Sequence, residues 1–307
     1  MKNFIKNKVI KRTILYFFGV LILLFIGKSL YSNWAQIKGL AITMDYSLLI
    51  LSLFLYIFYL FLDGIGWNFI LHALNVKLRY RDSITIFYLS QMARYLPGGV
   101  INIFGRVYLA QKKNISKTHS GASIVLEMFM KVFSAFVLSL FFLGHLYREW
   151  LWGFLVLLLV IFLVFFDLRL LNYLLNVFSN KFGNKFVFSL QRKTFLGILF
   201  YYISSWFIFG MAFKVFCNSL GIYGKSLVLV SVFPASWIAG FLSPIPGGIG
   251  VREGVLSYFL SFYFDKQLAY IMALLSRVWL IVGELSAGLV VFVFYSIVSK
   301  LMAKQNK

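Results

Sequence analysis

Residues 46–62 read YSLLILSLFLYIFYLFL, a run that contains no charged side chain. A helix needs about 20 mostly apolar residues to cross the hydrocarbon core of a bilayer. The uncharged run from Trp152 to Phe166, flanked by Glu149 and Asp167, is another such segment. Of all 307 residues, 61% are hydrophobic and only 13% are charged, and the mean hydropathy is +0.87. These values exclude a water-soluble globular domain and predict an all-α polytopic membrane protein.

Apolar length and flanking charge together predict about six full transmembrane helices. The predicted spans lie near residues 13–30, 46–71, 119–143, 147–167, 194–217 and 268–298. The basic opening MKNFIKNKVIKR is typical of a signal sequence, but no convincing small-residue cleavage site follows it. We therefore interpret it as the start of an uncleaved first helix, and residues 1–307 as a single integral membrane domain.

The formal net charge is +21, which in a soluble protein would suggest nucleic acid as a partner. Here the basic residues follow a membrane topology instead. With a cytoplasmic N-terminus, the inside loops (1–12, 72–82, 111–118, 168–193 and 299–307) hold 19 of the 30 Lys and Arg, and the outside loops hold five. This asymmetry is that of the positive-inside rule. We expect both termini in the cytoplasm, the chain in the cell (inner) membrane, and anionic lipid rather than nucleic acid beside the basic loops.

Two apolar stretches, 83–111 and 226–260, are interrupted by Pro, Gly-Gly and Arg. They hold all four prolines of the chain, at 97, 234, 244 and 246, and we expect helices to break there because proline lacks a backbone donor. Broken backbone at membrane depth is tolerated only where protein or a water-filled cavity surrounds it. Each stretch is therefore predicted to form a re-entrant hairpin, the first from the cytoplasmic face and the second from the outer face.

The two broken stretches resemble one another. Pro97-Gly-Gly-Val100 recurs as Pro246-Gly-Gly-Ile249, a shift of 149 residues, and the same shift superposes the flanking spans. This pattern predicts an internal repeat of about 46–143 on about 194–298. Because an odd number of full crossings separates the copies, the second is expected to be inverted, as in many transporters. The alternative is chance, since a four-residue match is weak in a Gly-rich membrane protein.

Several charged residues are predicted at membrane depth, where each costs about 2.5–3.5 kcal/mol at a helix centre and must be paired or solvated. They are Arg94, Arg106, Glu127, Lys131, Arg252, Glu253, Arg277 and Glu284. Glu127 and Lys131 have the i, i+4 spacing of a local ion pair. Arg252 and Glu253 are neighbours, so about 100° separates them around a helix and they must satisfy different partners.

The run Ser243-Pro-Ile-Pro-Gly-Gly-Ile-Gly-Val-Arg-Glu-Gly254 combines a rigid helix break, glycines that allow close backbone approach and a new helix that begins near Ile249. A helix N-terminus suits a phosphate, and Arg252 in its first turn could grip phosphate oxygens while Glu253 holds another cation. The candidate headgroup-binding residues are Arg94, Arg106, Arg252 and Arg277. The helix-break motif comprises Pro97, Gly98, Gly99, Pro244, Pro246, Gly247, Gly248 and Gly250. The candidate charge partners or ion-coupling groups are Glu127, Glu253 and Glu284. The alternative is a buried ion-pair network that only locks the hairpins.

Cysteine and histidine give no indication of metal chemistry. Cys217 is the only cysteine, so neither an intramolecular disulfide nor a cysteine-based metal site is expected. His72, His119 and His145 lie near separate span ends, which favours interfacial histidines over a zinc site. No cofactor is expected.

These motifs resemble the transmembrane region of bacterial lysylphosphatidylglycerol synthases, a flippase-like family. The resemblance covers most of the chain and rests on Arg94-Tyr-Leu-Pro-Gly-Gly99 with Arg106, on Ile124-Val-Leu-Glu127, on Pro244-Ile-Pro-Gly-Gly-Ile-Gly-Val-Arg-Glu-Gly254 and on Ser276-Arg277. The last glycine-rich motif is the specific one. In this chain PGGVINIFGR is longer and more apolar between glycine and arginine than the typical form. The resemblance implies transport or presentation of a membrane lipid, and a stand-alone membrane protein without the soluble synthase domain.

Three functions remain open from the sequence. The first is a flippase-like transporter of an anionic phospholipid or a polyprenyl-phosphate-linked lipid; no Gly-x-x-x-x-Gly-Lys-Ser/Thr nucleotide loop is present. The second is a membrane-embedded transferase in lipid-linked glycan or aminoacyl-lipid synthesis, although the longest non-membrane loop, 168–193, is too short for a separate catalytic domain. The third is an accessory partner of lipid or glycan synthesis enzymes. We expect the first, a transporter rather than an enzyme.

Overall fold

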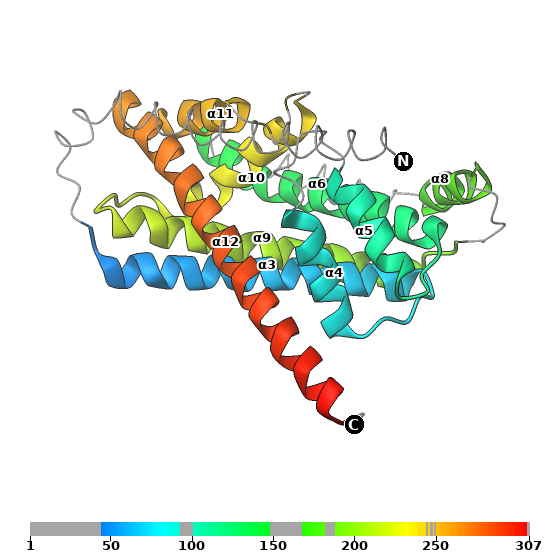
Figure 1. Cartoon of the computed structure of the whole chain (residues 1–307). Coiled ribbons are helices and arrows are strands. Elements are labelled where there is room, and N and C mark those ends of the chain that lie inside the picture. Colours follow the sequence, from blue (N-terminus) through cyan, green and yellow to red (C-terminus); the bar gives the residue numbers. More distant parts are fainter. Residues whose placement is uncertain are drawn as a thin grey trace, which may run out of the picture.

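The computed structural model describes residues 44–92, 101–147, 168–181, 188–243, 245, 248 and 250–305. Within these residues the secondary structure is helical, without a strand (Figure 1). The helices are α3 (Tyr46–Ala73), α4 (Tyr80–Met92), α5 (Ile101–Gln111), α6 (Lys117–Tyr147), α8 (Leu168–Lys181), α9 (Arg192–Ser219), α10 (Ser226–Leu242), α11 (Val251–Leu260) and α12 (Lys266–Gln305). The all-α prediction is confirmed for this part of the chain.

Four of these helices are long and apolar enough to cross a membrane: Tyr46–Ala73, Lys117–Leu140, Arg192–Ser219 and Lys266–Val291. Their starts agree within two residues with those of the predicted spans 46–71, 119–143, 194–217 and 268–298, and their ends differ by two to seven residues. The predicted span 13–30, and 147–167 beyond Tyr147, lie outside the described residues. The chain is therefore a helical membrane protein with at least these four candidate spans.

Helices α3 and α9 lie side by side and antiparallel along the molecule (Figure 1). The Asp45 carboxylate caps α3 by accepting from the backbone N–H groups of Ser47 and Leu48, at 2.9 and 3.1 Å. The Asp45 N–H in turn donates to the carbonyl of Ser219 at 2.8 Å, which ties the start of α3 to the end of α9. Gly66 lets the two helices approach closely, because a Cβ there would lie 2.8 Å from the Tyr202 hydroxyl.

Two pairs of short helices fill the space between the long ones. Helices α4 and α5 pack against each other and follow α3 in the chain, and α10 and α11 do the same after α9. In the predicted broken stretches 83–111 and 226–260, the described helices end at Met92 and Leu242 and resume at Ile101 and Val251. The predicted break is confirmed in the second stretch, where Ser243 after α10 is extended and the new helix begins at Val251, two residues after Ile249. The predicted break at Pro97-Gly-Gly lies outside the described residues.

One predicted break is wrong. Pro234 lies inside α10 and does not end it. Proline cannot donate to the carbonyl four residues earlier, which here belongs to Val230. Helix α9 packs directly against that carbonyl through Gly210, where a Cβ would lie only 2.1 Å from the Val230 oxygen. The free carbonyl is therefore covered by a neighbouring backbone, and α10 continues through the proline because the surrounding helices support it.

The order long, short, short, long occurs twice in the described helices. A shift of 149 residues carries the end of α5 at Gln111 to the end of α11 at Leu260, and the start of α6 at Lys117 to the start of α12 at Lys266. The core between the long helices is rich in stacked aromatic rings. Trp279 of α12 lies 4.7 Å from Tyr56 of α3, measured between ring centroids.

Candidate functional site

A chain of four buried charges joins α3, α5 and α6. The Arg106 guanidinium of α5 pairs with Glu127 of α6. The other carboxylate oxygen of Glu127 lies 2.8 Å from Lys131 Nζ, one helical turn later. Lys131 Nζ also donates to the Asp63 carboxylate of α3 at 3.0 Å. The four side chains alternate in sign and sum to zero, which is how such groups can exist at membrane depth.

The surroundings of Arg106 hold it in place. Its Nε donates to the Ser90 hydroxyl of α4 at 3.3 Å, and its guanidinium lies 4.4 Å from the centre of the Phe87 ring. Only 4% of Arg106 and 3% of Glu127 is exposed. Removing one member of so buried a pair leaves an uncompensated charge, which typically costs about 3–5 kcal/mol.

The second group of charges lies at the start of α11. Gly250, with φ +81°, forms the N-cap, and its backbone N–H donates to the Glu253 carboxylate at 2.7 Å. The other Glu253 oxygen lies 3.5 Å from Arg277 Nε of α12. Arg252, the neighbour of Glu253, lies instead over the Phe233 ring of α10 at 5.3 Å. The two adjacent charges thus have separate partners, as their angular separation on a helix predicts.

Close backbone packing positions this turn. Gly248 has φ +63°, and a Cβ on it would lie 2.7 Å from both the Cα and the carbonyl oxygen of Gly240 in α10. A Cβ on Gly240 would in turn lie 3.2 Å from the Arg252 Cβ. The predicted use of glycine for close approach is confirmed at Gly248, and it brings the first turn of α11 against α10.

A central cavity of about 520 Å³ connects the two charged groups. Residues of α3, α4, α5, α6, α9, α10, α11 and α12 line it, together with Ser243, Ile245 and Gly248 between α10 and α11. Its charged lining residues are Asp63, Arg106, Glu127, Lys131, Arg252 and Glu284, and its aromatic ones are Tyr56, Tyr59, Trp206, Phe209, Trp237 and Phe241. The Tyr56 hydroxyl donates to Glu284 at 3.2 Å. A mostly apolar wall with a few convergent charges is typical of a ligand site.

The amino-acid sequence matches a known protein family. The family model described as lysylphosphatidylglycerol synthase TM region matches residues 12–288. The chain belongs to this family. Comparison with curated proteins and with solved structures finds no match.

In this member of the lysylphosphatidylglycerol synthase TM-region family, the predicted site residues fall into three groups. Arg106, Glu127, Gly248, Arg252 and Glu284 line the central cavity. Glu253, Gly250 and Arg277 form the cap and ion pair beside it. Arg94, Pro97, Gly98, Gly99, Pro244, Pro246 and Gly247 lie outside the described residues. The predicted local Glu127–Lys131 pair is confirmed, and Arg277 pairs with Glu253 of the second broken stretch.

Sequence reasoning missed Asp63 and did not assign Lys131 to the site. Both line the cavity of this family member and pair with each other. The signal was present: Asp63 directly follows the uncharged run 46–62 and lies within the predicted span 46–71. An acid at that depth requires a cation from another span. The described residues contain no group of three His, Cys, Asp or Glu side chains arranged to hold a metal.

Proposed function

We propose that this protein is a flippase-like transporter of an anionic or polyprenyl-linked lipid, moving it across or within the cytoplasmic membrane. The observation that carries the proposal is the central cavity. Arg106, Lys131 and Arg252 line it together with Asp63, Glu127 and Glu284, among four helices long and apolar enough to span a membrane. A headgroup that carries a phosphate can bind in such a cavity by displacing the carboxylates from these cations.

The proposed transport uses an inverted repeat. Helices α3 to α6 form one half and α9 to α12 the other, and the 149-residue correspondence of helix ends supports the pairing of the halves. In Figure 1 the α4–α5 pair joins the long helices at the end of the molecule where α3 ends, whereas the α10–α11 pair joins them at the opposite end. Two hairpins that meet at one cavity from opposite ends permit alternating access by rocking one half against the other.

The positions of the basic residues support one orientation of the molecule in the membrane. The loops 74–79, 112–116 and 188–191 lie at one end of the bundle (Figure 1). Lys77, Arg79, Lys112, Lys113, Arg192 and Lys193 are in or beside these loops. We propose that this end is cytoplasmic, by the positive-inside rule.

Arg252 is the most informative residue for testing the transport proposal. It lines the central cavity from the first turn of α11, where the helix dipole and the guanidinium would favour the same anion. We expect Arg252→Gln to abolish movement of fluorescent phosphatidylglycerol between leaflets of reconstituted vesicles. Arg252→Lys should recover little, because an ammonium cannot reproduce bidentate geometry.

The matched control is Arg79→Gln, which removes an exposed arginine from the loop before α4 and should leave lipid movement unchanged. Thermal unfolding in detergent is measured beside the flux. An Arg252→Gln protein that unfolds early would indicate a structural role only, and a stable, fully active one would remove Arg252 from the site. Incubation with labelled sugar nucleotide or aminoacyl donor tests the transferase alternative, since a labelled lipid product would contradict a pure transporter.

A further inference from the structure

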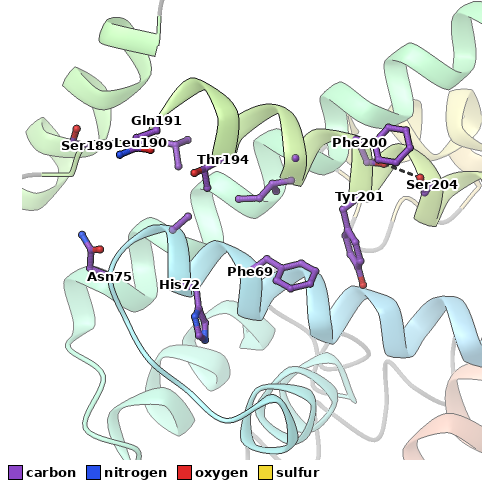
Figure 2. A pocket seen from close by; sticks show the side chains of 13 residues that line it. Phe69, His72, Asn75, Ser189, Leu190, Gln191, Thr194, Phe200, Tyr201 and Ser204 are labelled. Atoms are coloured by element: carbon purple, nitrogen blue, oxygen red, sulfur yellow. Dashed lines mark hydrogen bonds between the residues drawn. The ribbon is translucent and has the colours of Figure 1, made fainter.

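A second cavity, the α3–α9 groove, lies apart from the central one. It has a volume of about 840 Å³ and lies between the end of α3, the start of α9 and residues 189–191. Figure 2 shows side chains of both helices along it, among them Phe69, His72, Thr194 and Tyr201. None of its described lining residues also lines the central cavity, so the transport proposal leaves this groove unexplained.

The groove has a polar end and an apolar end (Figure 2). At the polar end are His72, Asn75, Ser189, Gln191 and Thr194, whose side chains make no hydrogen bond within the described part of the chain. The apolar end holds aromatic and aliphatic residues, and the polar groups there are already satisfied. The Tyr201 hydroxyl donates to the Leu62 carbonyl at 2.7 Å, and the Ser204 hydroxyl donates to the Phe200 carbonyl at 2.9 Å.

The two ends lie at different depths in the membrane. Helix α9 has 28 residues, about 42 Å at about 1.5 Å per residue, which exceeds the roughly 30 Å hydrocarbon core. With this excess shared between its two ends, the first turn reaches the headgroup layer and Tyr201, about 10 Å further along the axis, lies beside the acyl chains. Phe200 is 71% exposed, so this side of the helix pair faces lipid.

Charge at the polar end favours an anion. Among the described lining residues of the groove there is no Asp or Glu. Arg192 and Lys193 begin α9, and its N-cap, Gln191, makes no capping hydrogen bond through its side chain. The first backbone N–H groups of the helix therefore point towards the same end with a positive partial charge.

We infer that the α3–α9 groove is a binding site for one bilayer phospholipid with an anionic headgroup, separate from the cavity of the proposed transport. The phosphate lies near Thr194 at the start of α9, and an acyl chain lies along Phe69, Phe200 and Tyr201. The amphipathic lining, its depth and the basic charge at its outer end each match a part of that molecule. This inference does not depend on lipid transport by the central cavity.

Gly197 provides a clean test of occupancy. A Cβ at this groove-lining residue would meet nothing within 4 Å, so a side chain placed there extends into the groove. We expect Gly197→Leu to weaken phosphatidylglycerol binding at least about tenfold relative to Gly197→Ala, measured by native mass spectrometry of the detergent-purified protein. The alanine variant controls for the gain in helix propensity. Equal binding by the two variants would overturn the inference.

Two further experiments test the chemistry of the bound lipid and its position in the protein. The same measurement with phosphatidylcholine should show weaker binding than with phosphatidylglycerol, and Lys193→Gln should reduce that preference about fivefold. A photoactivatable phosphatidylglycerol should crosslink within residues 194–204, and this crosslink should survive Arg252→Gln. Absence of a preference between the two lipids, or crosslinks confined to the central cavity, would contradict an anionic-lipid site in the groove.

Discussion

Asp63 shows how one residue in an apolar helix depends on distant parts of the chain. It is only 5% exposed, and its carboxylate lies 3.0 Å from Lys131 Nζ on α6. Lys131 is shared with Glu127, which in turn holds Arg106. Removing one charge therefore unbalances all four groups, whereas removing one charge of each sign does not. This difference separates a coupled network from four independent residues.

We predict that Lys131→Met destabilises the protein by about 3–5 kcal/mol, because Asp63 and Glu127 lose their shared cation inside the membrane. Asp63→Asn added to Lys131→Met should restore most of this loss, since the pair Arg106–Glu127 remains balanced. Unfolding of the purified variants in mild detergent measures both changes. Additive destabilisation by the two substitutions would show that the charges are not coupled.

At the scale of elements, glycines decide how closely helices pack. Gly210 of α9 covers the Val230 carbonyl that Pro234 leaves without a donor in α10. Gly248 packs its backbone against Gly240 between α10 and α11. At both positions a side chain would meet backbone, which cannot rotate away, so the surrounding helices must separate.

We predict that Gly210→Ala destabilises the protein by about 1–3 kcal/mol, because its methyl group would overlap the Val230 carbonyl. Gly197→Ala in the same helix is the matched control. Nothing lies within 4 Å of a Cβ at that position, so this variant should be neutral or up to about 1 kcal/mol more stable. Thermal unfolding of both proteins compares them directly; equal stability would mean that α9 and α10 do not pack as closely as described.

We also predict that Gly248→Ala impairs folding more than Gly254→Ala. Gly248 has φ +63° and its Cβ would overlap Gly240, whereas a Cβ on Gly254 would meet nothing within 4 Å. The positive φ alone costs a non-glycine residue about 1–2 kcal/mol. Expression level and unfolding temperature test the comparison.

At the scale of the whole molecule, the arrangement makes a prediction about sidedness. Asn75 follows α3 at the basic end of the bundle, and Tyr223 lies between α9 and α10 and is 72% exposed. We predict that cysteines at these two positions, in a Cys217→Ala background, are labelled from opposite sides of the membrane, Asn75→Cys from the cytoplasm.

Cys217 is fully buried, so its replacement serves only to remove background labelling. Reporter fusions at Met1 and Lys307 extend the test, since both termini are expected in the cytoplasm. Labelling of both cysteines from one side would contradict the topology and the proposed inversion. A periplasmic signal from either terminus would contradict the six-span path.

The sequence by itself determined the class of protein, the four described spans and the helix break between α10 and α11. These are properties of local composition: apolar length sets whether a helix can span the bilayer, and a Pro-Gly-Gly run disfavours helix wherever it occurs. The Glu127–Lys131 pair and the separate partners of Arg252 and Glu253 were predictable for the same reason, since helix geometry relates residues within one or two turns.

Only the tertiary structure decided which distant residues meet. Asp63 and Lys131 are 68 residues apart, and their pairing depends on the faces that α3 and α6 turn towards each other. The continuation of α10 through Pro234 depends likewise on Gly210 of another helix. The α3–α9 groove exists only because two helices far apart in the chain lie side by side. In a bilayer each buried polar group must find a partner within the protein, and which partner it finds is a property of helix packing rather than of local sequence.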